Sequence, residues 1–285
     1  MKDVQGSLDK RGIAIDSVGI TGVKYPITLL DRANKSQRTI ADVTLSASLP
    51  HFSRGTHMSR LVEVLNQHHD RIRLETLPLM LQDVANRLNA EAVQVVLKFP
   101  YFIEKAAPVS KAKSLMSYEC TFSAVANGSV RDFVLGVRVP ITTLCPCSKT
   151  ISDYGAHNQR GVADVQIRTV VRSNGEPAFI WIEELIEIAE QCCSAPVYSL
   201  LKRPDERWLT MAAYDNPMFV EDVVRELTAK LKRDRRVAWF RAHVESEESI
   251  HNHNAFATLE WRRRKTPARA HAPSKSAVTM VASET

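Results

Sequence analysis

Residues 144–149 read Leu-Cys-Pro-Cys-Ser-Lys and stand between two runs that alternate apolar and polar residues. Val130–Leu144 precedes this stretch and residues 162–171 follow it, and both runs are rich in β-branched side chains. The pattern predicts a connection held between two half-buried strands. The same connection contains His157. A cysteine and a histidine placed this way can bind a divalent metal, or the thiol can act as a nucleophile; packing cysteines and a turn histidine are the alternative.

On both sides of this stretch, apolar periodicity predicts the order strand, strand, helix, helix, strand, strand in each half of the chain. The first set covers residues 23–29, 39–49, 58–69, 75–89, 92–102 and 115–126. The second set covers residues 130–144, 162–171, 181–193, a helix capped by Asn216, and residues 237–245 and 253–261. Asn127 and Gly128 form a hairpin-turn signal between the sets. Antiparallel sheets with helices layered on one face give an α+β class.

These elements predict four segments. An irregular arm covers residues 1–20, a first ββααββ module 21–128, a second module 129–262, and a disordered basic tail 263–285. The formal charge of +6 depends largely on that tail, so a solubilising tail is favoured over a nucleic-acid-binding arm.

Composition narrows the class of protein further. The chain has 285 residues, of which 44% are apolar and 25% charged, as in ordinary globular proteins. It has no apolar run of about 20 residues and no signal-peptide pattern, so no membrane association is expected. Its five cysteines are an odd number, which favours free thiols in a reducing cytoplasm.

Three further stretches are more polar than their positions require. Residues 202–207, Lys-Arg-Pro-Asp-Glu-Arg, are interpreted as a solvated loop between helices. Glu221 lies early in the last helix, where the helix dipole favours a carboxylate. Residues 245–254 form the connection before the last strand, and His251 and His253 there would project to one face about 7 Å apart in an extended chain. Imidazoles and carboxylates on one rim can do acid–base work near neutral pH.

Five motifs in order carry a resemblance to a known family. They are residues 55–60 (Gly-Thr-His-Met-Ser-Arg), 144–149, 155–160 (Gly-Ala-His-Asn-Gln-Arg), 200–206 (Leu-Leu-Lys-Arg-Pro-Asp-Glu) and 248–253 (Glu-Ser-Ile-His-Asn-His). Together they resemble GTP cyclohydrolase IB, the prokaryotic alternative to the type IA enzyme, over about residues 19–261. The resemblance implies a tunnelling fold (T-fold) of two ββααββ modules and a homotetramer with active sites at subunit interfaces.

The reaction that the resemblance implies is hydrolysis of the guanine imidazole ring of GTP, at its cyclic amidine C–N bonds, which gives 7,8-dihydroneopterin triphosphate and formate. It would serve tetrahydrofolate biosynthesis and, in some bacteria, queuosine biosynthesis. Cys145, His157 and Glu206 would hold one divalent metal, Zn²⁺, Mn²⁺ or Fe²⁺, which leaves room for a water that attacks C8 of guanine.

The resemblance implies roles for further residues. Glu221 would anchor guanine through N1–H and the 2-amino group. Glu248, His251 and His253 would be the acid–base groups, and Cys147 would act beside the metal thiolate. Cations that could contact the triphosphate are His57, Arg60, Lys149, Arg160, Lys202 and Arg203.

Two other functions stay open on the sequence. A deazaguanine nitrile reductase of the same fold would use a cysteine nucleophile and NADPH, but the Cys-Pro-Cys segment with His157 and the 248–253 motif favour the cyclohydrolase. A non-catalytic nucleic-acid binder would instead show steeply salt-dependent binding that depends on the basic tail.

Overall fold

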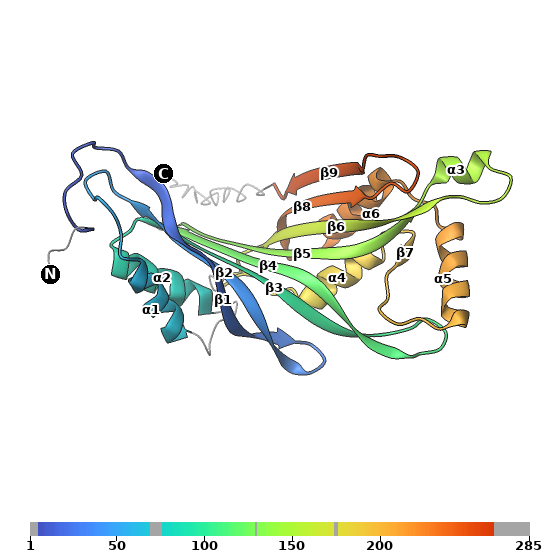
Figure 1. Ribbon diagram of the computed structural model, residues 1–285, viewed down its shortest axis with the longest axis horizontal. Helices are drawn as coiled ribbons and strands as arrows, with labels where there is room; N and C mark the ends of the chain where they lie inside the picture. Colours follow the sequence, from blue (N-terminus) through green and yellow to red (C-terminus); the bar gives the residue numbers. More distant parts are fainter. Residues whose placement is uncertain (1–4, 69–75, 129, 174–175, 265–285) are drawn as a thin grey trace, which may run out of the picture.

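The computed structural model describes residues 5–68, 76–128, 130–173 and 176–264. Within these residues the strands form one antiparallel sheet in the order β1-β2-β3-β4-β5-β6-β8-β9, and β7 pairs with β5 (Figure 1). The strands are β1 (Ile15–Asp31), β2 (Lys35–Leu49), β3 (Ala92–Ala106), β4 (Lys113–Asn127), β5 (Val130–Leu144), β6 (Asn158–Thr169), β7 (Ala195–Pro196), β8 (Val237–Ser246) and β9 (Ala255–Arg262). The helices are α1 (Met58–His68), α2 (Leu77–Leu88), α3 (Pro146–Ile151), α4 (Ile182–Glu190), α5 (Arg203–Asp215) and α6 (Val220–Arg233).

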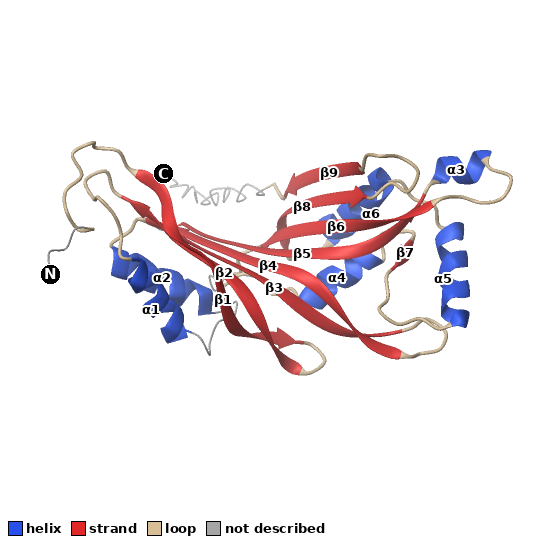
Figure 2. Cartoon of the chain, in the orientation of Figure 1, coloured by secondary structure: helices blue, strands red, loops and turns tan. Residues whose placement is uncertain are grey.

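One face of the sheet carries the hydrophobic core. Residues that pair across the strands form apolar rows on that face, such as Val43, Leu97, Phe122, Leu135, Ile167 and Phe240. The apolar sides of α1, α2, α4 and α6 pack against these rows in one continuous cluster (Figure 2). The apolar side chains, which recur every second residue in the strands and about every 3.6 residues in the helices, therefore pack together on one face of the sheet. The predicted α+β class with helices on one face is confirmed.

The opposite face of the sheet is polar. The neighbouring row there is Asp42, Lys98, Thr121, Gly136, Gln166 and Arg241. Ion pairs such as Lys24 with Asp42 (2.6 Å) and Arg138 with Glu119 (2.5 Å) satisfy charges on this face. A trough of about 680 Å³ runs along it, and no described helix packs on it.

The irregular arm predicted for residues 1–20 is wrong from Ile15 onward, because β1 begins there and pairs with the end of β2. Two register shifts, between Ile15 and Val18 and between Ile20 and Val23, break the alternation that marks a strand in the sequence. Gly19 also approaches Leu45 so closely that a Cβ would lie 1.9 Å from its carbonyl oxygen. Residues 1–4, residue 129 at the predicted module boundary and residues 265–285 of the predicted tail lie outside the described residues.

Two predictions for the second half, one of a loop and one of a helix cap, are wrong. Residues 202–207 do not form a loop; they begin α5, because the Asp205 carboxylate accepts the Lys202 N–H (2.8 Å) and closes the first turn. Asn216 ends α5 and does not cap the next helix. α6 begins at Val220, where the Asp222 carboxylate accepts the Phe219 N–H (3.1 Å).

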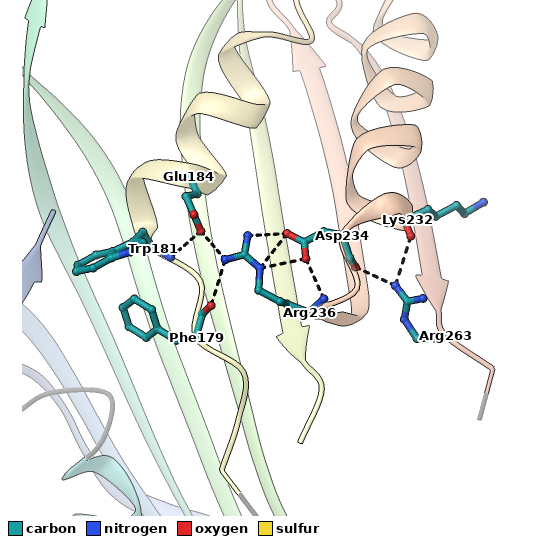
Figure 3. Close-up of polar contacts among 7 residues, drawn as sticks. All are labelled: Phe179, Trp181, Glu184, Lys232, Asp234, Arg236 and Arg263. Atoms are coloured by element: carbon teal, nitrogen blue, oxygen red, sulfur yellow. Dashed lines mark hydrogen bonds and ion pairs between the residues drawn. The ribbon is translucent and has the colours of Figure 1, made fainter. Parts of the chain in front are cut away.

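A polar network fixes the end of the second half at which β8 begins (Figure 3). The Arg236 guanidinium donates to both oxygens of Asp234, to Glu184 (3.0 Å) and to the Phe179 carbonyl (3.3 Å). Arg263 donates to the backbone carbonyl of Asp234 (2.9 Å). These bonds join the start of α4, the end of α6 and the end of β9.

Candidate functional site

The opposite end of the second half brings three motif segments together. The last residue of β5, Leu144, pairs with the first residue of β6, Asn158, so that residues 145–157 form a loop closed at its base. The Cys145 N–H donates to the His157 carbonyl (3.1 Å) across that base. Glu247, just after β8, donates its N–H to the Arg160 carbonyl (2.9 Å). The 144–149, 155–160 and 248–253 motifs therefore lie at one end of the sheet.

Cys145 occupies the position before α3. Its half-buried sulfur accepts the Ser148 N–H at 3.4 Å, and Pro146 follows at the first helical position. This explains the Cys-Pro-Cys sequence locally, because proline has no N–H that would go unsatisfied in a first turn. Cys147 lies within the same short helix and is exposed.

The ring of His157 is held from one side. Its Nδ1 lies 3.0 Å from the Gln159 side-chain oxygen and 3.3 Å from Ser249 Oγ. Gln159 in turn donates to Glu248 at 3.4 Å, so a chain of contacts runs from His157 to that carboxylate. In the part of the chain that the structure describes, Nε2 of His157 has no hydrogen-bond partner. An imidazole with one nitrogen fixed and the other open has the arrangement of a metal ligand.

Glu221 lies in the first turn of α6, close to the same loop. The N–H of Met218 donates to the Leu144 carbonyl (3.0 Å), which ties the chain before α6 to the residue before Cys145. The Glu221 carboxylate is exposed and contacts no partner among the described residues. It is therefore open to a ligand that donates two hydrogen bonds.

His251 and His253 lie next to each other on the loop between β8 and β9. Their ring centroids are 5.1 Å apart and the rings are nearly parallel, at 11°. Both residues are exposed. The predicted proximity of the two imidazoles is confirmed, although the segment is a loop and not an extended strand.

Glu206 is not brought to Cys145 and His157 within one chain. It lies in the first turn of α5, whereas Lys149 of α3 contacts Tyr214 in the last turn, with Nζ 4.2 Å from the ring centroid. Glu206 and Tyr214 are therefore about 12 Å apart along the helix axis, at about 1.5 Å per residue. Across the described ranges, no three His, Cys, Asp or Glu side chains are close enough to hold a metal. One chain thus offers a thiol and an imidazole with the right chemistry, but no third ligand.

The predicted triphosphate cations occupy three places. Lys149 and Arg160 lie at the Cys145 end, and Lys202 and Arg203 lie at the start of α5. His57 directly precedes α1 and Arg60 lies in its first turn, in the first half of the chain (Figure 1). A single chain does not gather these six side chains around one ligand.

The comparisons decide the family of this chain. A model described as type I GTP cyclohydrolase folE2 matches residues 1–257. The chain belongs to this GTP cyclohydrolase family. The GTP cyclohydrolase FolE2 of Citrifermentans bemidjiense is 51% identical over 91% of this chain and 94% of that protein. The FolE2 of Geobacter sulfurreducens is 48% identical over 93% of this chain and 100% of its own. The predicted resemblance to a GTP cyclohydrolase is confirmed at this level.

Solved structures bear on the fold of this cyclohydrolase chain. Uricase from Arthrobacter globiformis superposes with a TM-score of 0.51 at 8% identity, over 90% of this chain and 96% of that one. Urate oxidase from Bacillus sp. TB-90 gives 0.52 at 8% identity, over 87% and 100%. At such identities the likeness shows the fold alone, and the predicted tunnelling fold is confirmed.

The five thiols of this GTP cyclohydrolase family member divide into two groups. Cys120, Cys192 and Cys193 are buried, and burial raises the pKa of the Cys192 thiol to about 11. Cys145 and Cys147 are at least partly accessible. All five are free. Only the second pair is placed for chemistry.

Sequence reasoning missed two functional candidates in the cyclohydrolase motifs. Gln159 and Ser249 contact His157, and neither was given a role. The available signal was that Gln159 lies two residues after His157, a spacing that puts side chains on the same side of an extended chain. None of the helices in the described ranges is long and apolar enough to cross a membrane.

Proposed function

We propose that this protein is a GTP cyclohydrolase of type IB, which hydrolyses GTP to 7,8-dihydroneopterin triphosphate and formate for folate biosynthesis in the cytoplasm. Family membership over residues 1–257 supports the reaction. The contacts that join Cys145, His157, Gln159 and Glu248 carry the assignment of the site, because they place a thiol, an imidazole and a carboxylate at one end of the sheet.

One divalent metal would be held by Cys145, His157 and Glu206, and Zn²⁺, Mn²⁺ or Fe²⁺ would suit this mixed set of ligands. When bound, the metal supplies a Lewis acid that activates water for attack on guanine. Because Glu206 lies at the other end of α5 from Lys149, we infer that a second copy contributes one part of the site. A homotetramer with active sites between subunits would provide that copy, and the edges of β1 and β9, with which no other described strand pairs, could take part in further association.

The other side chains bind and orient the substrate. Gln159 and Ser249 hold the His157 ring in one orientation, which leaves Nε2 to the metal. Glu221 would accept hydrogen bonds from guanine N1–H and the 2-amino group, a pair of donors that adenine does not offer in this arrangement. The basic side chains of both motif regions would converge on the triphosphate once subunits associate.

Proton transfer would fall to the groups on the β8–β9 loop. Glu248 is positioned by Gln159, and His251 and His253 are exposed at the same loop. These groups would move protons during ring opening, formate release and the later rearrangement of the sugar. Cys147, one residue beyond the proline, is available beside the metal thiolate.

The test is an absorbance assay on metal-stripped protein. GTP alone should give no product, and re-supply of Zn²⁺, Mn²⁺ or Fe²⁺ in turn should restore formation of 7,8-dihydroneopterin triphosphate and an equal amount of formate. NADPH oxidation with a deazaguanine nitrile, and no turnover of GTP under any metal, would instead support the nitrile reductase and refute the proposal.

A further inference from the structure

α5 is an exposed helix that is held at its two ends. Of its 13 residues only Asp205 and Ala213 are buried. A helix of this length is marginal alone in water, so its place depends on specific attachments. At its last turn, Lys149 of α3 contacts Tyr214 by hydrogen bond and over the ring. At its first turn, the attachment is Asp205.

Asp205 is a fully buried carboxylate, with 0% of its surface exposed, and its hydrogen bonds come from a distant part of the chain. One oxygen accepts the N–H groups of Val109 and Ser110, both at 2.8 Å. The other accepts the Ser110 hydroxyl at 2.6 Å and the Lys202 N–H at 2.8 Å. Two acceptor oxygens with two bonds each leave no capacity unused, so the first turn of α5 is fixed in both position and rotation.

Val109 and Ser110 form the tip of the β3–β4 hairpin, which belongs to the first half of the chain. The tip is closed by Ala107 N–H to the Ala112 carbonyl (2.9 Å), and Lys111 adopts a left-handed conformation at φ 59°. The hairpin reaches across to α5 at one end of the molecule (Figure 1). A rigid turn is thus clasped onto the helix that carries Glu206.

Glu206 follows Asp205 directly, and the helix rotates by about 100° per residue. With Asp205 turned into the hairpin, Glu206 is turned out of it and is exposed. The rotation of α5 about its own axis therefore decides where the Glu206 carboxylate points. Asp205 is the residue that sets this rotation.

We propose that Asp205 is a positioning residue, which clasps the first turn of α5 to the β3–β4 hairpin and so aims Glu206 toward the metal of the active site. The inference rests on the proposed function, in which Glu206 is a ligand. It adds a role for the hairpin tip, a segment that carries none of the five motifs.

The experiment compares Zn²⁺ affinity, measured by chelator competition on the full-length apoprotein, with thermal unfolding of the same samples. Asp205→Asn keeps the size of the side chain but puts an amide N–H₂ opposite N–H and O–H donors. We expect its Zn²⁺ affinity to fall by about 10- to 100-fold, the usual effect of losing a partner that orients a ligand. Excess Zn²⁺ should restore turnover of GTP.

Ala213→Gly is the matched control, since it alters the other buried residue of α5. It should lower the unfolding temperature and leave Zn²⁺ affinity unchanged. Ser110→Ala removes one of the four hydrogen bonds without touching α5 and serves if Asp205→Asn does not fold. Its Zn²⁺ affinity should fall by about 3- to 10-fold, which corresponds to one hydrogen bond.

The Glu206→Gln variant distinguishes the ligand role of Glu206 from the positioning role of Asp205. If it loses Zn²⁺ while Asp205→Asn and Ser110→Ala bind Zn²⁺ like the wild type, the positioning role is wrong and the proposed function stands. If Glu206→Gln itself binds Zn²⁺ like the wild type, Glu206 is not a ligand, and the inference falls with that part of the proposed function. An equal loss of affinity in Ala213→Gly would also overturn the positioning role, because the effect would then be general destabilisation.

Discussion

The two ends of the second half use similar side chains for opposite purposes. At the end where β8 begins, Arg236 meets Asp234, Glu184 and a backbone carbonyl, so that charge and hydrogen-bonding capacity are paired locally (Figure 3). At the end where β8 finishes, Glu221, His251 and His253 are exposed and Nε2 of His157 lacks a partner among the described residues. Paired groups stabilise the fold, whereas unpaired groups remain available to a ligand.

Removing the metal ligands should have the largest effect. Cys145→Ala or His157→Ala should lose bound metal and lower kcat/KM by on the order of 10³-fold, because several kcal/mol of transition-state stabilisation are lost. Metal content and turnover are measured on the same samples. Cys192→Ala is the matched control, a buried thiol that should affect stability and leave both readouts intact. Full turnover by His157→Ala would show that Nε2 of His157 does not bind a metal that the reaction needs.

Glu221→Ala should have the second largest effect, on the binding of GTP. GTP binding should weaken by about 10²-fold, since two hydrogen bonds to a charged acceptor are lost at about 1.5–3 kcal/mol each, with partial replacement by water. Equilibrium binding of GTP to the metal-free protein measures this without turnover. Glu226→Ala, an exposed glutamate on the same helix, should bind GTP normally. Equal affinity in both variants would contradict the anchor role.

Arg236→Ala tests the paired end. Loss of the guanidinium removes the cation that pairs with Asp234 and Glu184 and should lower the free energy of unfolding by about 2 kcal/mol. Turnover well below the unfolding temperature should be unchanged, because the network lies at the other end of β8. Arg235→Ala, a neighbouring exposed cation, should change neither quantity. A loss of turnover in a fully folded Arg236→Ala protein would break the division between the two ends.

The smallest expected effect is on the stability of the protein in acid, through Asp234 at the end where β8 begins. Hydrogen bonds from the Arg236 side chain hold the pKa of the Asp234 carboxyl below its ordinary value of 3.8. A lowered folded pKa contributes stability that is present above about pH 4 and is lost as the pH falls through the folded value. The stability difference between wild type and Asp234→Asn should therefore be constant from pH 5 to 7 and shrink below about pH 4. Denaturant titrations at each pH measure it, and a difference that grows in acid would have the wrong sign.

Sequence reasoning succeeded where local pattern dominates. The prediction for residues 130–144 coincides with β5, because the segment is rich in β-branched residues and Val137, Val139 and Ile141 are buried at alternate positions. The resemblance also implied that Cys145, His157 and Glu206 hold one metal, but a single chain brings only Cys145 and His157 together among the described residues. α5 was missed because its first turn is highly polar, and what holds it is the contact of Asp205 with a hairpin some 95 residues away in the chain. The start of β1 was missed because two register shifts hide its alternation.

The continuity of the sheet has a consequence for the integrity of the chain. β4 and β5 pair from Glu119 with Arg138 to Asn127 with Val130, and the apolar row through Phe122 and Leu135 continues across this pair of strands. A protease that cleaves the exposed turn at Gly128 would cut the polypeptide, but the two fragments would stay associated through the sheet. The two fragments should migrate together on a sizing column and separate only in denaturant.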